Sequence, residues 1–125
     1  VHSNLSGKSK ILVLGVTFKE NVPDLRNTKV VDIIQVLREL GHEVDVHDPL
    51  ADKDEASQFL DIDLIENLSD LNGYDAIVGA VAHSVYRDLS PAALEEMVGG
   101  KGLLADVKGI WRNTEFSPDI KRWQL

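Results

Sequence analysis

Basic and imidazole side chains follow three apolar segments of the chain, at positions where buried strands would end. The segments are KILVLG at 10–15, DAIVGAV at 75–81 and LLADV at 103–107. The side chains that follow them are Lys19, Arg26, His83, Arg87, Lys108 and Arg112. Because open α/β sheets bind ligands at the carboxyl ends of their strands, we expect these side chains to gather at one edge. Cations gathered on an acidic chain favour an anionic small ligand, such as a phosphate or diphosphate.

The bulk composition predicts one soluble globular domain spanning residues 1–125. Apolar residues make up 43% of the chain and charged residues 27%, which is ordinary for such a domain. A net charge of −8 argues against a broad nucleic-acid-binding face. The chain has no Cys, so disulfides, Cys-ligated zinc and a thiol nucleophile are excluded within it. No apolar run approaches the roughly 18 residues of a membrane helix, and nothing points to secretion, so we expect a cytoplasmic location.

Apolar periodicity predicts strands that alternate with helices. We expect strands over 10–16, 42–48, 62–65, 75–81 and 103–107, and helices over 30–40, 52–60 and 91–98, with a helical turn at 68–71 and a helical or irregular cap at 113–125. Such alternation implies a parallel sheet with helices on both faces. The predicted fold class is α/β: a Rossmann-like three-layer sandwich with a mostly parallel sheet of five to six strands.

The helices carry recognisable start and stop signals. In the first helix, apolar residues recur at helical spacing, and they are Val30, Ile33, Ile34, Leu37 and Leu40. Asn27 or Thr28 is expected to cap its start, and Gly41 its end. The second helix is expected to bury Ala56, Phe59 and Leu60 on one side. Ser90 followed by Pro91 predicts a well-defined start for the last helix.

The loop between the first strand and the first helix does not match a dinucleotide site. That site needs G-x-G-x-x-G, so that backbone can approach the pyrophosphate. Here Gly15 is followed by Val16, Thr17, Phe18 and Lys19, so a single glycine of the pattern is present. Asp48 stands where such sites carry a ribose-binding acid, but Asp followed by Pro is also a common turn. We therefore expect this chain to bind no NAD.

The same loop carries a longer pattern that resembles a known family. Phe18 and Lys19, then Asp24, Arg26 and Thr28, spell F-K-x-x-x-x-D-x-R-x followed by Ser or Thr. With the later HDP and DVKG segments, the chain from Lys10 to Trp111 resembles the C-terminal, UDP-binding domain of the UDP-glucose/GDP-mannose dehydrogenases. The closing D-V-K-G replaces the D-G-R of UDP-glucose 6-dehydrogenases. Together with Val81 to His83, it is more similar to the N-acetylhexosamine branch, which leaves the exact sugar open.

The resemblance implies a reaction that this chain alone cannot perform. Family members oxidise the C6 alcohol of a nucleotide sugar to a carboxylate in two NAD-dependent hydride transfers, which supplies precursors of polysaccharides. An N-terminal domain holds NAD, a catalytic Cys forms a thiohemiacetal and then a thioester, and a helical middle domain makes a homodimer or larger assembly. Because this chain has no Cys and no glycine fingerprint, it resembles an inactive nucleotide-sugar-binding fragment. Neither a catalytic residue nor a metal ligand is expected in it.

The resemblance also suggests roles for individual residues. Lys19 would contact the phosphate or sugar end of a UDP-sugar, and Lys108, at the place of the D-G-R arginine, would contact phosphate or ribose. Phe18 would lie against the nucleotide or a domain interface, or else belong to the core. Arg26 is also a candidate for ligand contact, but its i, i+2 spacing from Asp24 in a Pro-containing loop favours an ion pair that shapes the loop. In a third interpretation, Arg26 faces the partner domain. His83 is a further candidate for ligand contact, with a polar loop residue as the alternative.

A second function class stays open at this stage. The chain would then be a stand-alone Rossmann-like module that binds a nucleotide or a CoA-like ligand without catalysis. The parent reading frame discriminates between the two classes. A dehydrogenase requires an upstream G-x-G-x-x-G domain and a Cys in a helical domain, whereas a frame that opens near Val1 favours the stand-alone module.

Overall fold

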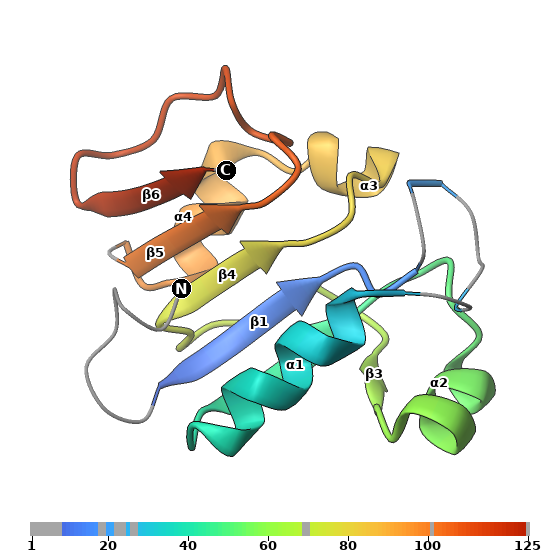
Figure 1. Ribbon diagram of the computed structural model, residues 1–125. Coiled ribbons are helices and arrows are strands. Elements are labelled where there is room, and N and C mark those ends of the chain that lie inside the picture. The colour runs from blue at the N-terminus through green and yellow to red at the C-terminus, as the bar shows by residue number, and fades with distance from the viewer. Residues whose placement is uncertain are drawn as a thin grey trace.

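A six-stranded parallel sheet forms the centre of the protein, as the alternating pattern predicts. The computed structural model describes residues 9–17, 20–21, 25, 28–68, 71–100 and 102–124. Its strands are β1 (Lys10–Leu14), β2 (Glu43–His47), β3 (Leu64–Ile65), β4 (Ala76–Gly79), β5 (Gly102–Asp106) and β6 (Ile120–Gln124). They lie in the order β3-β2-β1-β4-β5-β6, and every neighbouring pair is parallel. All carboxyl ends therefore meet at one edge, to which the arrowheads of β1, β4 and β5 point (Figure 1).

Helices cover both faces of this sheet, which gives the predicted three layers. They are α1 (Val30–Glu39), α2 (Lys53–Leu60), α3 (Ser84–Arg87) and α4 (Pro91–Met97). Helix α1 lies in front of the sheet in Figure 1, and α4 lies behind it. The strand order reverses between β1 and β4, because the chain extends the sheet in one direction through β3 and in the other from β4. Open sheets of this kind bind ligands beside that switch point.

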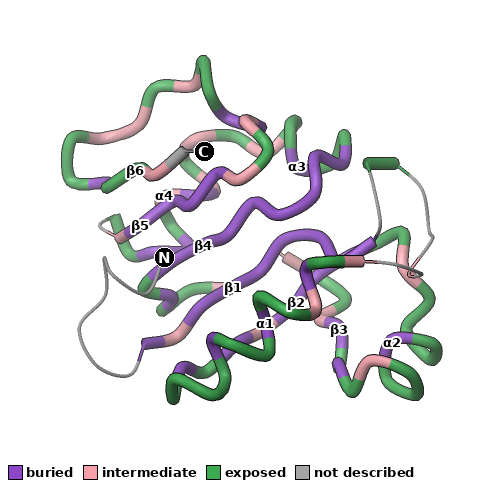
Figure 2. Tube along the Cα trace, viewed as in Figure 1, coloured by how far each residue is buried: buried purple, intermediate pink, exposed green. Residues whose placement is uncertain are grey.

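Alternate residues of β1 build the two apolar cores. Ile11 and Val13 belong to the core beneath α1 and α2, whereas Leu12 and Leu14 belong to the core beneath α3 and α4. Successive side chains of a strand point to opposite faces, so a strand buried on both sides reads as a continuous apolar run. Figure 2 shows this as burial along all of β4 and along β1 after its first residue.

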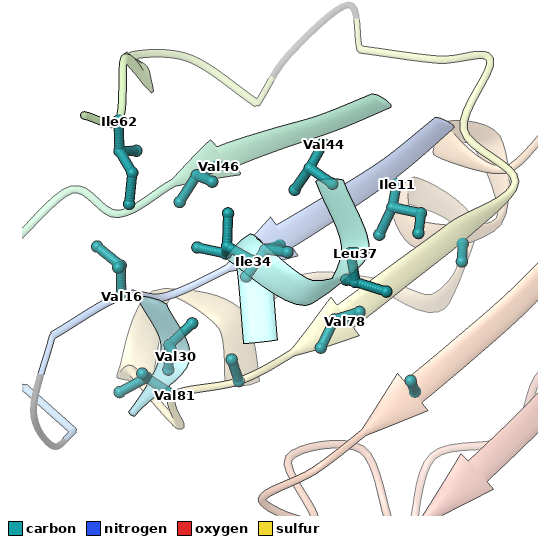
Figure 3. Packing of buried hydrophobic residues seen from close by; sticks show 14 of the residues in the cluster. Ile11, Val16, Val30, Ile34, Leu37, Val44, Val46, Ile62, Val78 and Val81 are labelled. Atoms are coloured by element: carbon teal, nitrogen blue, oxygen red, sulfur yellow. The ribbon is translucent and has the colours of Figure 1, made fainter. Parts of the chain in front are cut away.

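Helix α1 packs through a narrower stripe than its sequence predicts. Val30, Ile34 and Leu37 are buried against the sheet, and Figure 3 shows Ile34 and Leu37 pointing between the strands. Ile33 and Leu40 lie at the margin of this stripe and are 37% and 47% exposed. The predicted N-cap is wrong: Lys29 is the N-cap and its side chain makes no capping hydrogen bond, although the Val30 N–H donates to the hydroxyl of Thr28, one residue before the N-cap, at 3.3 Å. The end fits the prediction, because Gly41 adopts a left-handed φ of 94°. Asn27 lies outside the described residues.

The other helices follow their start signals. In α2, the Asp52 carboxylate caps the N–H of Glu55, and in α4 the Ser90 hydroxyl caps the N–H of Ala93. One prediction for α2 is wrong: Phe59 is 71% exposed, whereas Ala56 is buried and Leu60 is partly buried against the core.

The tail and one loop differ from prediction. Residues expected to form a helical or irregular cap instead contribute β6, which pairs with β5 along all five of its residues. The loop after β4 folds into the short helix α3. At 68–71 the described residues, 68 and 71, are not helical, and 69 and 70 lie outside the described part. Within the described residues, no helix has the length and apolar character needed to cross a membrane.

Candidate ligand site at the carboxyl edge of the sheet

The ends of β1 and β4 approach each other closely at the switch point. Gly15 has a φ of 97°, and a Cβ built on it would lie 2.5 Å from the Cβ of Val81. The Gly15 N–H donates to the carbonyl of His47 at 2.8 Å, which extends the pairing of β1 with β2 by one residue. Glycine is therefore required here because two strands meet, and this requirement explains its presence without any pyrophosphate.

The Asp48 carboxylate organises the start of the first loop. Its Oδ2 accepts hydrogen bonds from the backbone N–H groups of Val16 at 2.8 Å and Thr17 at 3.1 Å. Its Oδ1 accepts from the N–H groups of Leu50 at 2.9 Å and Ala51 at 3.3 Å. Asp48 is only 3% exposed. Burial acts to raise its pKa, but hydrogen bonds from His83, Val16 and Leu50 more than offset that effect and leave the pKa below its usual range.

His83 completes this arrangement from the end of β4. Its Nε2 lies 2.9 Å from Asp48 Oδ2 and 3.2 Å from the Thr17 hydroxyl, and its Nδ1 accepts the N–H of Asn21 at 2.9 Å. The side chain is fully buried. Both ring nitrogens therefore face protein groups, and the structure offers the ring no ligand-facing side. Its geometry favours the polar, structural alternative over ligand contact.

Tyr86 in α3 connects the ends of β2 and β4 from the other face. Its hydroxyl donates to the carbonyl of His47 at 2.7 Å and lies 2.9 Å from the Nδ1 of the same residue. Its backbone carbonyl accepts the indole N–H of Trp111 at 3.0 Å. Burial is the main cause that raises the pKa of Tyr86 and lowers the pKa of His47. Tyr86 and Trp111 thus belong to the core beneath the site.

The turn after β5 presents two cations. The buried Asp106 carboxylate accepts the N–H groups of Ile110 at 2.7 Å and Trp111 at 2.8 Å, which fixes the turn. Lys108, at its tip, is exposed. The guanidinium of Arg112 lies over Gly109, where a Cβ would be 2.8 Å from its Nη2. The D-V-K-G segment therefore consists of a structural carboxylate and an exposed ammonium group.

A shallow hollow of about 570 Å³ adjoins this turn. It lies between residues 112–118 and β6, and Arg112 and Arg122 contribute to its lining. The Arg122 guanidinium donates to the carbonyls of Thr114 and Trp111 and lies 5.0 Å from the centre of the Phe116 ring. Arg122 is thus committed to holding the chain segment between β5 and β6.

The other predicted site residues divide into two groups. Phe18, Lys19, Asp24 and Arg26 lie outside the described residues, so their roles stay predictions. Arg87 is described, and its guanidinium lies 3.7 Å from the Glu20 carboxylate, which links α3 to the first loop. Sequence reasoning placed Lys108 and His83 at one edge, and the structure puts both at strand ends. It gave no role to Thr17 or Asn21, whose contacts with His83 have no sequence signal.

These residues do not fit a dinucleotide at the switch point. A ribose-binding acid must have free lone pairs, but the Asp48 oxygens already accept five hydrogen bonds, four from backbone amides and one from His83. Val16 and Thr17 are fully buried, so their side chains occupy the space beside the strand end. Among the described residues, no group of three or more His, Asp or Glu side chains could hold a metal ion.

Comparisons with known proteins identify the family to which this chain is similar. The family described as "UDP-glucose/GDP-mannose dehydrogenase family, UDP binding domain" matches residues 12–113. Protein CapL of Staphylococcus aureus is 42% identical over 113 residues, which are 90% of this chain and 26% of CapL. The UDP-N-acetyl-D-glucosamine 6-dehydrogenase of Pseudomonas aeruginosa is 39% identical over 100 residues, 80% of this chain and 24% of the enzyme. The chain thus spans about a quarter of the length of these relatives.

Solved structures share the fold at lower identity. The NDP-N-acetyl-D-galactosaminuronic acid dehydrogenase of Methanosarcina mazei Go1 superposes with a TM-score of 0.80 at 23% identity, over 94% of this chain and 24% of that one. The UDP-N-acetyl-mannosamine dehydrogenase Cap5O of S. aureus gives a TM-score of 0.74 at 23% identity, over 98% of this chain and 27% of that one. At such identities the likeness concerns the fold.

Proposed function

We propose that this chain, which belongs to the UDP-glucose/GDP-mannose dehydrogenase family, is the domain that binds the diphosphate of a UDP-sugar. The observation that carries this proposal is the exposed Lys108 at the end of β5, on a turn that the buried Asp106 carboxylate fixes. A fixed backbone presents the ammonium group to the edge where such sheets bind ligands. Lys19 would supply a second cation from the loop after β1.

The whole protein would be an NAD-dependent nucleotide-sugar 6-dehydrogenase of the N-acetylhexosamine branch. This rests on the relatives, which include a UDP-N-acetyl-D-glucosamine 6-dehydrogenase. NAD would be held by another domain and accept hydride from the sugar C6 alcohol, while the residues of this chain bind and orient the substrate. We further propose that residues 1–125 are one C-terminal domain of a longer chain. That chain would be a cytoplasmic homodimer or larger assembly in polysaccharide precursor synthesis.

Titration of the 125-residue chain tests the proposal. UDP should perturb the amide signals of residues 106–112 in nuclear magnetic resonance spectra more strongly than NAD does. A charge-assisted hydrogen bond contributes about 1.5–3 kcal/mol, so K108Q should weaken UDP binding about tenfold or more. K121Q is the matched control, because Lys121 is an exposed lysine within the edge strand β6. Tighter binding of NAD than UDP, or equal losses in both variants, would refute the assignment.

Nucleotide preference separates the sugar question from the binding question. UDP-GlcNAc, UDP-glucose and GDP-mannose can each be titrated against the full-length enzyme with steady-state turnover as the second readout. Preference for an N-acetylated UDP-sugar would support the branch. Binding of a CoA-like ligand with no response to UDP would favour the stand-alone module instead.

A further inference from the structure

We propose that His83 is a positioning residue: supported by Asp48, it anchors the backbone on both sides of positions 18 and 19. The inference deepens the proposed function, because those positions carry the Phe-Lys pair expected to meet the ligand. It concerns only the anchors themselves, which are Val16 and Thr17 before the pair and Asn21 after it. His83 acts on the ligand through these backbone groups and touches no ligand itself.

The hydrogen bonds define the tautomer of His83. A backbone N–H can only donate, so the Nδ1 that receives the Asn21 N–H at 2.9 Å carries no proton. The proton of the neutral ring then lies on Nε2, which faces Asp48 Oδ2 at 2.9 Å and the Thr17 hydroxyl at 3.2 Å. The ring therefore works as a bridge, with its donor on the carboxylate and its acceptor on the loop. With Nδ1 as acceptor and Nε2 as donor, the ring links the backbone of Asn21 to Asp48 Oδ2, the same oxygen that accepts the N–H groups of Val16 and Thr17.

A second hydrogen bond also connects Asn21 to the chain that follows β4. The Asn21 side-chain oxygen accepts the N–H of Ser84 at 2.9 Å. Asn21 adopts a φ of 59°, a left-handed conformation that asparagine tolerates better than most residues. Its backbone and its side chain are thus both turned toward residues 83 and 84. Together, the hydrogen bonds to His83 and Ser84 hold Asn21 in one orientation, whereas one bond alone would let the residue rotate about that bond.

Because these hydrogen-bonding groups are buried, the arrangement of the loop around His83 is strongly favoured over arrangements that break the bonds. His83 is 0% exposed and Asp48 3% exposed, so a broken bond would leave a polar group without water to replace its partner. The anchored residues are past the end of β1, so the ladder hydrogen bonds of the sheet do not hold them. Neither His83 nor Asp48 belongs to the apolar cores beneath the two sheet faces, although the side chain of Val16 packs in one of them. Loss of the bridge should therefore release the loop more than it unfolds the domain.

Two substitutions separate the two ends of the bridge. H83Q places an amide N–H₂ near the position of Nε2, so it keeps a donor for Asp48 and loses the acceptor for Asn21. H83N places an amide oxygen near the position of Nδ1, so it keeps the acceptor and loses the donor. Y74F is the matched control, because the buried Tyr74 hydroxyl donates to Asp45 at 2.7 Å on the opposite edge of the sheet.

Hydrogen exchange of individual amides is the decisive readout, with UDP affinity by calorimetry as the second. In H83Q the Asn21 amide should exchange about tenfold faster or more, while the amides of residues 11–14 in β1 stay protected. UDP binding should weaken about tenfold, because ligand binding must then fix the released Asn21 backbone again. H83N should restore protection at Asn21 and recover most of the UDP affinity. Y74F should lower the unfolding midpoint without changing UDP affinity.

The outcomes separate this inference from the proposed function. If the Asn21 amide of H83Q stays as protected as in the wild type, the bridge does not anchor the loop and the inference fails. If that amide is released while UDP affinity is unchanged, His83 has a structural role alone and the inference also fails. If the wild-type chain does not bind UDP at all, but the Asn21 amide is released in H83Q and protected in H83N, the proposed function fails and the anchoring role of His83 stands.

Discussion

Replacing Asp48 with asparagine tests the physical basis of the site most directly. The substitution keeps the shape of the side chain and exchanges one acceptor oxygen for a donor. In the structure, Oδ1 accepts from two backbone amides and Oδ2 from two more and from His83. Whichever way the new amide turns, at least two backbone N–H groups face an N–H₂ group and lose their acceptor.

The expected cost follows from that count. A buried donor left unpaired costs about 1–3 kcal/mol, so two of them predict that D48N loses about 3 kcal/mol of unfolding free energy. For a domain of this size such a loss lowers the melting temperature by roughly 10 °C. Against a typical total stability of about 5–15 kcal/mol, the variant should still fold, which allows the measurement.

The assay is urea unfolding at neutral pH, followed by circular dichroism. D45N is the matched control on the same strand, because Asp45 is partly exposed and accepts the Tyr74 hydroxyl, which an amide oxygen can still do. We expect a loss below about 1 kcal/mol for D45N. A loss in D48N no greater than that in D45N would refute the view that Asp48 organises the loop.

Two further predictions concern acid stability and the close approach of two strands. Burial, partly opposed by Asp48, holds the pKa of His47 below the ordinary 6.5, so the unfolded chain binds more protons below that pH. Stability should therefore be complete above pH 6.5 and decline as the pH falls below it, and urea midpoints from about pH 7.5 to about pH 5.5 should decline less steeply in H47N than in the wild type. G15A should cost about 3 kcal/mol or more in the same assay, because its Cβ would clash with Val81 at 2.5 Å in a left-handed conformation. A loss below about 1 kcal/mol would show that β1 and β4 can separate at this point.

Apolar periodicity and the helix start and stop signals predicted most of the fold. Continuous apolar runs marked β1 and β4, because parallel strands are buried on both faces. The Ser-Pro start of α4 was confirmed because capping depends on neighbouring residues. β6 was missed, since its residues IKRWQ follow no alternating apolar pattern and pairing with β5 decides their conformation.

The site was less predictable than the fold. Lys108 at a strand end could be identified, because topology alone brings the carboxyl ends together. The role of Asp48 was open, since a ribose-binding acid and a turn-forming aspartate look alike in sequence. His83 was expected to contact the ligand or to be a polar loop residue, and nothing nearby in sequence signals its partners. Its contacts with Thr17 and Asn21 span 66 and 62 residues and exist only in three dimensions.

The bridge through His83 also bears on the order in which the molecule is made. It joins chain segments that are 31 to 66 residues apart, so it cannot close until β4 has been synthesised and has docked beside β1. Loop closure over such separations is among the later events of folding. During synthesis, an emerging chain would therefore form β1 to β4 before the proposed anchor could hold Asn21, and a ligand site that depends on this anchor could be completed only after that. Binding competence in this protein would mark the end of folding, not an early stage of it.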